Sequence, residues 1–227
     1  MELGILTTDR SEDGKIWINL EVAQECIQKR AVRYDKDGDS HYDTISAFIK
    51  SMRGSDPDAA VYYLARMLYA GEDIKFIARR IIICAAEDVG MADPQALVVA
   101  VNASLAVERV GMPEARIILA EAVTYVATAP KSNASYLAVD EAMEYLKNHR
   151  ALPVPAHLQD RHYSGAAKLG RGLDYQYAHS YPHHYVKQQY LPDGMEGTVF
   201  YRPTDNGYER QVTQWMEFLK RESGEQE

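Results

Sequence analysis

Nucleotide chemistry requires a phosphate-binding loop, and Gly14-Lys15 is the pair of residues that could belong to one. Such a loop has the form Gly, four residues, then Gly-Lys-Ser/Thr, because its backbone amides and its lysine surround the phosphates. Here Ile16 follows the lysine, and Asp9 stands where the first glycine belongs. The residues therefore predict no cofactor site, for ATP or for Mg²⁺, in this sequence.

The residue patterns that metal binding and hydrolase chemistry require are also absent from the sequence. His179 and His183 are four residues apart, as on a metal-binding helix, but Pro182 lies between them and no Cys or carboxylate is near. Asp35–Asp39 alternates carboxylates like a calcium loop, yet Ser46 stands where that loop needs a bidentate Glu. The serines lack a Gly-x-Ser-x-Gly setting. We therefore predict no catalytic and no metal-binding residue, and interpret these runs as a packed tail and a polar turn.

Charged side chains on or beside largely apolar helices form the first candidate site. A charge in such a position needs an opposite charge or a partner surface, because an unpaired buried charge is costly. Pairing and capping within the molecule is one interpretation. The sharper hypothesis is that some of these charges line a subunit or domain interface. The candidates are Lys50, Arg53, Arg79, Arg80, Glu87, Asp88 and Lys131.

Basic residues interleaved with tyrosines form the second candidate site. Between residues 150 and 190 the sequence has five Arg or Lys against two Asp, and six Tyr are placed among them. This mixture suits single-stranded DNA, since bases stack on aromatic rings while phosphates pair with cations. The net charge of -8 of the whole chain opposes it, and the tyrosines could simply pack the tail. The candidate DNA contacts are Arg161, Lys168, Arg171, Tyr175, Tyr177 and Lys187.

Helices are expected to carry the first set of charges. Apolar residues recur at helical spacing between residues 43 and 150, and Asp, Pro or Gly punctuates the pattern at short intervals. Short connections make each helix fold back on its predecessor, so the pattern predicts an all-α fold of stacked antiparallel hairpins. The expected helix starts are Asp43, Asp56-Pro57, Asp73, Asp93-Pro94, Met112-Pro113 and Asn133, with Gly54, Gly71, Gly90 and Pro130 as stops.

The composition changes after Arg150. Residues 151–207 are rich in Pro, Gly, Tyr and His, and we expect them to wrap over the helical body. A short β-hairpin could pair Thr198–Tyr201 with Tyr208 across Asp205-Asn206-Gly207. A last amphipathic helix is predicted over Glu209–Glu222. No long apolar run predicts a membrane span, and the two cysteines fit reduced core positions of a cytoplasmic protein.

Distinctive runs of residues follow one another from about residue 34 to the end of the tail. The main ones are His41–Ala60, Tyr62–Leu68, Ala78-Arg79-Arg80, Glu87–Gly90, Ala129–Asn133, Pro153–Leu158 and Gln189–Pro192. Together they closely resemble the RarA/MgsA family of AAA+ ATPases, the replication-associated recombination proteins that are related to the eukaryotic Werner helicase-interacting protein. The matching runs cover most of the chain.

The resemblance implies a C-terminal region. A family member begins with an AAA+ core that binds ATP and Mg²⁺, continues with a helical lid, and ends with a region that assembles homotetramers, similar to a clamp-loader collar. By that comparison residues 1–33 are a remnant of the lid, residues 34–150 the oligomerisation domain, and residues 151–227 a tail with a terminal helix. The intact protein would be a cytoplasmic, nucleoid-associated, DNA-dependent ATPase of replication-fork maintenance, recombination and repair.

Three functions are compatible with the residues. Self-association is the leading hypothesis. The helices have more aromatic residues, such as Tyr62, Tyr63 and Tyr69, than a simple helical bundle needs, and such residues favour an interface. Direct binding of single-stranded DNA by the tail is the alternative. Docking of another replication protein, such as a single-strand-binding protein, is a third possibility that the residues neither favour nor exclude.

Overall fold

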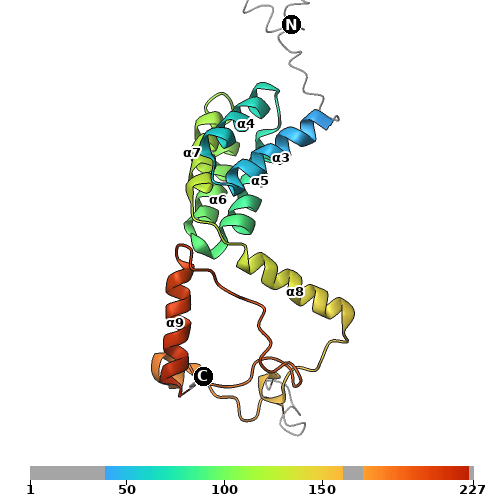
Figure 1. The fold of residues 1–227 in the computed structure, drawn as a ribbon, viewed down its shortest axis with the longest axis vertical. Helices are drawn as coiled ribbons and strands as arrows, with labels where there is room; N and C mark the ends of the chain where they lie inside the picture. The colour runs from blue at the N-terminus through green and yellow to red at the C-terminus, as the bar shows by residue number, and fades with distance from the viewer. Residues whose placement is uncertain (1–38, 161–170, 225–227) are drawn as a thin grey trace, which may run out of the picture. The chain divides into compact units, whose positions relative to one another are not determined.

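Helices make up the regular structure of this protein (Figure 1). The computed structural model describes residues 39–160 and 171–224, with side chains from His41 onward. Within those ranges there are seven α-helices and no strand, so the all-α prediction is confirmed. The helices, with the labels of Figure 1, are α3 (Asp39–Arg53), α4 (Pro57–Tyr69), α5 (Ile74–Cys84), α6 (Gln95–Val110), α7 (Ala115–Thr128), α8 (Ala134–Asn148) and α9 (Glu209–Glu222).

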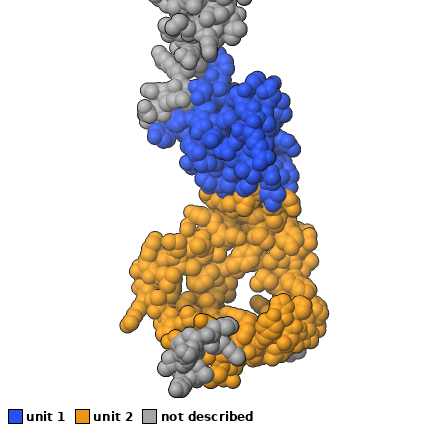
Figure 2. All heavy atoms as spheres, turned by 180° about the vertical axis from the view of Figure 1, so that it is seen from behind, with its two compact units in different colours: residues 1–84, 98–128 blue, residues 85–97, 129–227 orange. Residues whose placement is uncertain are grey.

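The chain forms two compact units, which Figure 2 shows in different colours. Unit 1 comprises residues 1–84 and 98–128, and unit 2 comprises residues 85–97 and 129–227. The division predicted at residue 150 falls inside unit 2, so α8 shares a unit with the tail. The predicted lid remnant, residues 1–33, lies outside the described residues.

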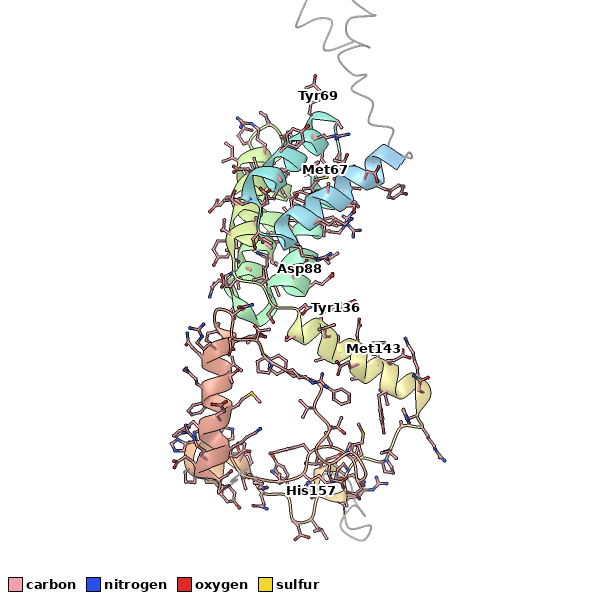
Figure 3. All side chains as sticks on the ribbon, viewed as in Figure 1. Met67, Tyr69, Asp88, Tyr136, Met143 and His157 are labelled. Carbon is pink, nitrogen blue, oxygen red and sulfur yellow. The ribbon has the colours of Figure 1, made fainter. Side chains whose placement is uncertain are left out.

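Unit 1 is a helical core built around α3, α4, α5 and α7. Apolar residues at helical spacing face inward, and α3 packs against both α4 and α7. Met67 on α4 points into this core in Figure 3. The largest side chains with almost no solvent exposure in unit 1 are Phe48, Met52, Leu64, Met67, Ile77, Ile81, Leu119, Val107, Val123 and Val126.

Aspartates start three of the helices, as predicted. Asp56 accepts a hydrogen bond from the amide of Ala59 at 2.9 Å, and Pro57 occupies the first position of α4. Asp73 and Asp93 accept from the second amide after them, each at 3.0 Å. The expected start at Asp43 was wrong, because α3 already begins at Asp39.

The end of α5 differs from the prediction of a helix that stops at Gly90. The α-helix ends at Cys84 and continues as one turn of π-helix, η1 (Ala85–Val89), and one turn of 3-10 helix, η2 (Gly90–Ala92). A π-turn inserts an extra residue into the helical repeat and is frequent at functional sites. Glu87 and Asp88, two of the candidate charges, lie in η1.

The tail of unit 2 is irregular rather than a β-hairpin. Residues 198–204 have no strand, and Asp205-Asn206-Gly207 instead lead into α9, so the hairpin prediction was wrong. The terminal helix α9 has the predicted bounds. Most described side chains between residues 171 and 184 are exposed, which differs from the expected close packing of the tail.

Candidate functional site

The predicted charge cluster is distributed over both units. Lys50 and Arg53 lie in the last turn of α3, where both side chains are exposed. Arg79 and Arg80 lie on α5 and place their guanidinium groups 5.8 and 5.0 Å from the ring centre of Phe76. Both distances are within the range of a cation–π contact. These four cations belong to unit 1, and two of them meet at one aromatic ring.

The three remaining candidates belong to unit 2. Asp88 is buried in η1, and its backbone carbonyl accepts a hydrogen bond from the amide of Ser132 at 2.8 Å. Lys131 precedes that serine and donates from Nζ to the carbonyl of Ala129 at 2.6 Å. Glu87 is partly exposed on the same π-turn. The structure thus places the Glu87-Asp88 and Lys131-Ser132 runs side by side.

A buried carboxylate that the sequence did not reveal lies next to these runs. Glu209, in the first turn of α9, has 0% of its surface exposed. Its Oε2 accepts from the amide and from the hydroxyl of Thr204, both at 2.7 Å, and its Oε1 accepts from the Tyr201 hydroxyl at 3.0 Å. Ser132 donates a further hydrogen bond to it. The carboxylate is therefore satisfied by neutral donors from three residues in two segments of the chain, residues 201–204 and residue 132.

Two glycines allow the backbone to close around this carboxylate. Gly207 has φ +52°, and a Cβ there would overlap the carbonyl oxygen of Ala92 and lie 2.7 Å from Pro130 Cγ. Gly90 has φ +51°, and its Cβ would lie 2.7 Å from the carbonyl oxygen of Ser132. We call the assembly of η1–η2, residues 130–132 and residues 204–209 the Glu209 junction. Both α8 and α9 begin at it.

The environment of Glu209 changes the ionisation of two groups. Burial raises the pKa of the Glu209 carboxyl, but hydrogen bonds from Thr204, Ser132 and Tyr201 outweigh burial and hold the pKa below 4.5. Burial, together with the hydrogen bond to Glu209 and its negative charge, raises the pKa of Tyr201 to about 12. Glu209 is therefore ionised and Tyr201 is neutral across the physiological range.

We expect unit 2 to lose stability in acid through Glu209. A carboxyl whose pKa is lower in the folded chain stabilises the fold above its unfolded pKa, and that contribution disappears as the pH falls through the folded value. The melting temperature of the chain, followed by circular dichroism, should therefore drop more between neutral pH and pH ~3 than that of Glu209→Gln, which cannot titrate there. Parallel pH profiles of the two proteins would contradict this assignment.

Helix α8 exposes an apolar stripe. Tyr136, Val139, Met143 and Leu146 are spaced three, four and three residues apart, so they share one face of the helix. These four side chains are 42 to 57% exposed, and Ala134 is the one buried residue of this fifteen-residue helix in the structure described. In Figure 3 the labels of Tyr136 and Met143 mark this helix. We call these four residues the α8 stripe.

The opposite face of α8 is engaged within unit 2. Glu141 accepts from Arg202 Nη1 at 2.7 and 2.9 Å. Glu144 accepts from Asn148 Nδ2 at 2.8 Å, and the ring of Tyr145 stacks on that of His149 with centres 4.3 Å apart. Polar side chains on this face of the helix therefore have partners in the chain, and the side chains of the α8 stripe are 42 to 57% exposed.

Unit 1 exposes apolar side chains as well. Tyr62 and Tyr69, two of the tyrosines that predict an interface, are 62% and 67% exposed on α4. On α6, Val98, Val101 and Leu105 are exposed at a spacing of three and four residues. Isolated exposed apolar residues are normal, but repeated ones on one helix face mark interaction surfaces.

The described members of the predicted DNA-contact set lie in the tail of unit 2. Arg171, Tyr175, Tyr177 and Lys187 are all exposed, whereas Arg161 and Lys168 lie outside the described residues. Of the two histidines considered as a metal pair, His179 has its ring 4.7 Å from that of His184, and His183 lies against an aromatic ring of α9. The ring of His183 lies 5.0 Å from that of Phe218. No group of three or more His, Cys, Asp or Glu in the described ranges is placed to hold a metal ion.

One further observation concerns membranes. Across residues 39–160 and 171–224, none of the helices combines the length and the apolar character needed to cross a bilayer.

Family models and known relatives match most of the chain. The model described as MgsA AAA+ ATPase C terminal matches residues 54–220, and the model described as AAA C-terminal domain matches residues 1–53. The boundary between the two models falls at the turn between α3 and α4, although α3 packs within unit 1.

Three relatives illustrate the match. Replication-associated recombination protein A of Bacillus subtilis is 51% identical over 207 residues, which cover 91% of this chain and 49% of that protein. The protein of the same name from Escherichia coli K12 is 39% identical over 209 residues, or 92% of this chain and 47% of that protein. ATPase WRNIP1 of Dictyostelium discoideum is 40% identical over 176 residues, or 77% of this chain and 20% of that protein.

The chain spans about half the length of the bacterial relatives it matches. The family model covers well over half of this chain, and the runs Glu87–Gly90 and Ala129–Asn133 that carry the resemblance meet at the Glu209 junction. The chain therefore belongs to the MgsA family of AAA+ ATPase C-terminal regions, whose relatives are the replication-associated recombination proteins A and ATPase WRNIP1.

Proposed function

We propose that this chain is the self-association module of a AAA+ ATPase and that it assembles into a homotetramer. The α8 stripe is the observation that carries the proposal. A fifteen-residue helix is marginally stable alone in water, so a helix of this length normally depends on packing of its apolar face. The spacing of three and four residues is the one by which helices pack against each other in bundles and coiled coils.

A second copy of the chain fits the stripe better than a charged ligand does. Its four side chains are two aliphatic residues, a methionine and a tyrosine, types that favour the buried centre of an interface. The exposed tyrosines of α4 would extend the contact in unit 1. The Glu209 junction would fix the direction in which α8 leaves unit 2.

We also propose the role of the parent protein. The names of the relatives describe proteins of replication-associated recombination and an ATPase. By analogy the parent protein would be a DNA-dependent AAA+ ATPase of fork maintenance, recombination and repair, with ATP and Mg²⁺ bound by its AAA+ core. A single-strand-binding protein remains a candidate partner, and nucleoid association a candidate location.

The solution mass of the chain tests the self-association proposal. Static light scattering over about a hundredfold range of concentration should give a mass near four chains, with dissociation only at the dilute end. A mass of one chain at every concentration would exclude self-association through these helices.

Binding of single-stranded DNA by the tail is a second candidate function. The exposure of Tyr175 and Tyr177 favours it, because rings that pack the tail internally would be buried. Arg171 and Lys187 are exposed in the same stretch. Charge reversal at Lys168 and Arg171 should weaken binding of a single strand and reduce its salt dependence, since each phosphate contact contributes to the slope.

A further inference from the structure

The tail of unit 2 contains two neighbouring cavities that share one wall. The first, of 380 Å³, is lined by aromatic and polar residues that include His157, Tyr175 and Tyr190. The second, of 450 Å³, is lined mainly by amides and one carboxylate, including Gln176, Gln188 and Asp174, and again by His157. We call them the tyrosine pocket and the glutamine pocket. Each has the volume of a site for a small organic ring.

Hydrogen bonds within the tail hold these pockets in shape. His157 Nε2 donates to the carbonyl of Gln189 at 2.7 Å, which fixes the shared imidazole wall. The side chain of Gln188 bridges the backbone of Gln176, donating to its carbonyl at 2.8 Å and accepting from its amide at 3.3 Å. The amide of Gly172, in the tyrosine pocket, donates to the carbonyl of Ala156, in the glutamine pocket, at 2.8 Å. The pockets are thus built from segments that are far apart in sequence.

We infer that the tyrosine and glutamine pockets take adjacent bases of a single-stranded nucleic acid. Tyr175 and Tyr190 are 44% and 54% exposed at the rim of the first pocket, so each ring offers a face on which a base can stack. Arg171 and Lys187 precede lining residues of the two pockets and are exposed, so that the phosphates would run outside. This inference rests on the second candidate function.

The carboxylates of the pockets favour binding of a base and oppose binding of a phosphate. Asp160 lines the tyrosine pocket and Asp174 the glutamine pocket. A carboxylate repels a phosphate group but accepts a hydrogen bond from the exocyclic amine of a base. Both donor hydrogens of Gln188 Nε2 are engaged within the chain, by the Gln176 carbonyl and the Tyr190 hydroxyl, but Gln188 Oε1 can accept a further hydrogen bond from an amine at the edge of a base. The bases are therefore the part of the strand that the pockets can hold.

Fluorescence anisotropy with the whole chain tests the inference. The probes are labelled single strands of about 20 nucleotides, longer than the ~4–16 nucleotides that one binding module covers, as DNA, as RNA, and as an abasic strand of equal charge. We expect either base-containing strand to bind at least about tenfold more tightly than the abasic strand, because stacking contributes roughly 1–3 kcal/mol per base. The tighter of the DNA and RNA strands identifies the physiological ligand.

Substitutions locate the binding. Tyr175→Ala and Tyr190→Ala should each weaken binding at least about fivefold, while the corresponding Phe variants keep the stacking face and most of the affinity. Tyr42→Ala is the matched control, since Tyr42 is 66% exposed but lies on α3 of unit 1. Equal binding of the abasic strand would overturn the pockets and leave electrostatic single-strand binding. Unchanged binding by both Ala variants would overturn them as well, because the bases would then be bound elsewhere. No binding by the wild-type chain would overturn both.

Discussion

Glutamate at Val139 and Met143 is expected to convert the assembled chain into monomers. Both side chains lie in the α8 stripe, where a second copy would bury them. An unpaired charge buried at such a contact costs several kcal/mol, so the dissociation constant should rise at least about 100-fold. Light scattering and sedimentation equilibrium of the double variant should give the mass of one chain at concentrations where the wild type is assembled.

The matched control is Leu137→Glu on the same helix. Leu137 is 45% exposed and apolar, but it follows Tyr136 by one residue and so lies about 100° around the helix. This variant should keep the wild-type mass, and circular dichroism should show that all variants retain their helices. Dissociation by Leu137→Glu alone, or continued assembly of the double variant, would remove α8 from the interface.

The starts of α4 and α5 in unit 1 could be predicted because their signals are local. Asp56 and Asp73 cap helices with amides that are two or three residues away, and the apolar repeat of each helix lies within one segment. The bounds of α9 were predictable for the same reason. Local capping energies of about 1 kcal/mol decide where a helix begins when no distant contact competes.

The Glu209 junction could not be predicted because its contacts are distant in sequence. Glu209 is buried by donors that include Ser132, and the amide of Tyr208 donates to the carbonyl of Ala92 at 2.7 Å. Asp205-Asn206-Gly207 has the composition of a hairpin turn, yet Asn206 Nδ2 donates to the carbonyl of Lys131 at 2.9 Å. These turn residues therefore lead into a helix and not into a hairpin, because a distant segment supplies their hydrogen-bond partners.

The apolar repeat of α8 shows a different limit of sequence reasoning. Periodicity correctly predicts a helix between residues 133 and 149, but it indicates only that one face is covered and not what covers it. In the structure that face is exposed, while Glu141 and Glu144 on the other side are engaged. The apolar face of α8 is therefore a candidate interface that the sequence reasoning missed, and it stands beside the predicted charged residues, which remain a hypothesis.

The proposed self-association and the junction are physically connected. Ser132, which donates a hydrogen bond to Glu209, lies two residues before the start of α8, so the direction of the α8 stripe depends on the closure of residues 204–209 over Ala92 and Ser132. A change that opens the junction should therefore disturb both the stability of unit 2 and the geometry of assembly. Substitution of Gly207 by alanine is such a change, because the single methyl group that it adds has no room beside Ala92.

Gly207→Ala is expected to destabilise unit 2 by roughly 3 kcal/mol or more. An L residue at φ +52° costs about 1–2 kcal/mol, and the added methyl group meets the backbone of Ala92, which can only move by breaking its bond to Tyr208. Gly197→Ala is the control, because Gly197 has φ +75° but no atom within 4 Å of the added Cβ. It carries the conformational cost alone, about 1–2 kcal/mol.

The difference in the free energy of unfolding between Gly207→Ala and Gly197→Ala measures the cost of the close contact between residue 207 and the backbone of Ala92. Urea unfolding followed by the fluorescence of Trp215 on α9, in a Trp17→Phe background, measures it in the relevant unit. Gly207→Ala should unfold at distinctly lower urea than Gly197→Ala, since the free energy of unfolding falls linearly with denaturant. Equal midpoints would mean that residues 204–209 do not close on Ala92 in solution, and the burial of Glu209 would then have to be abandoned with them.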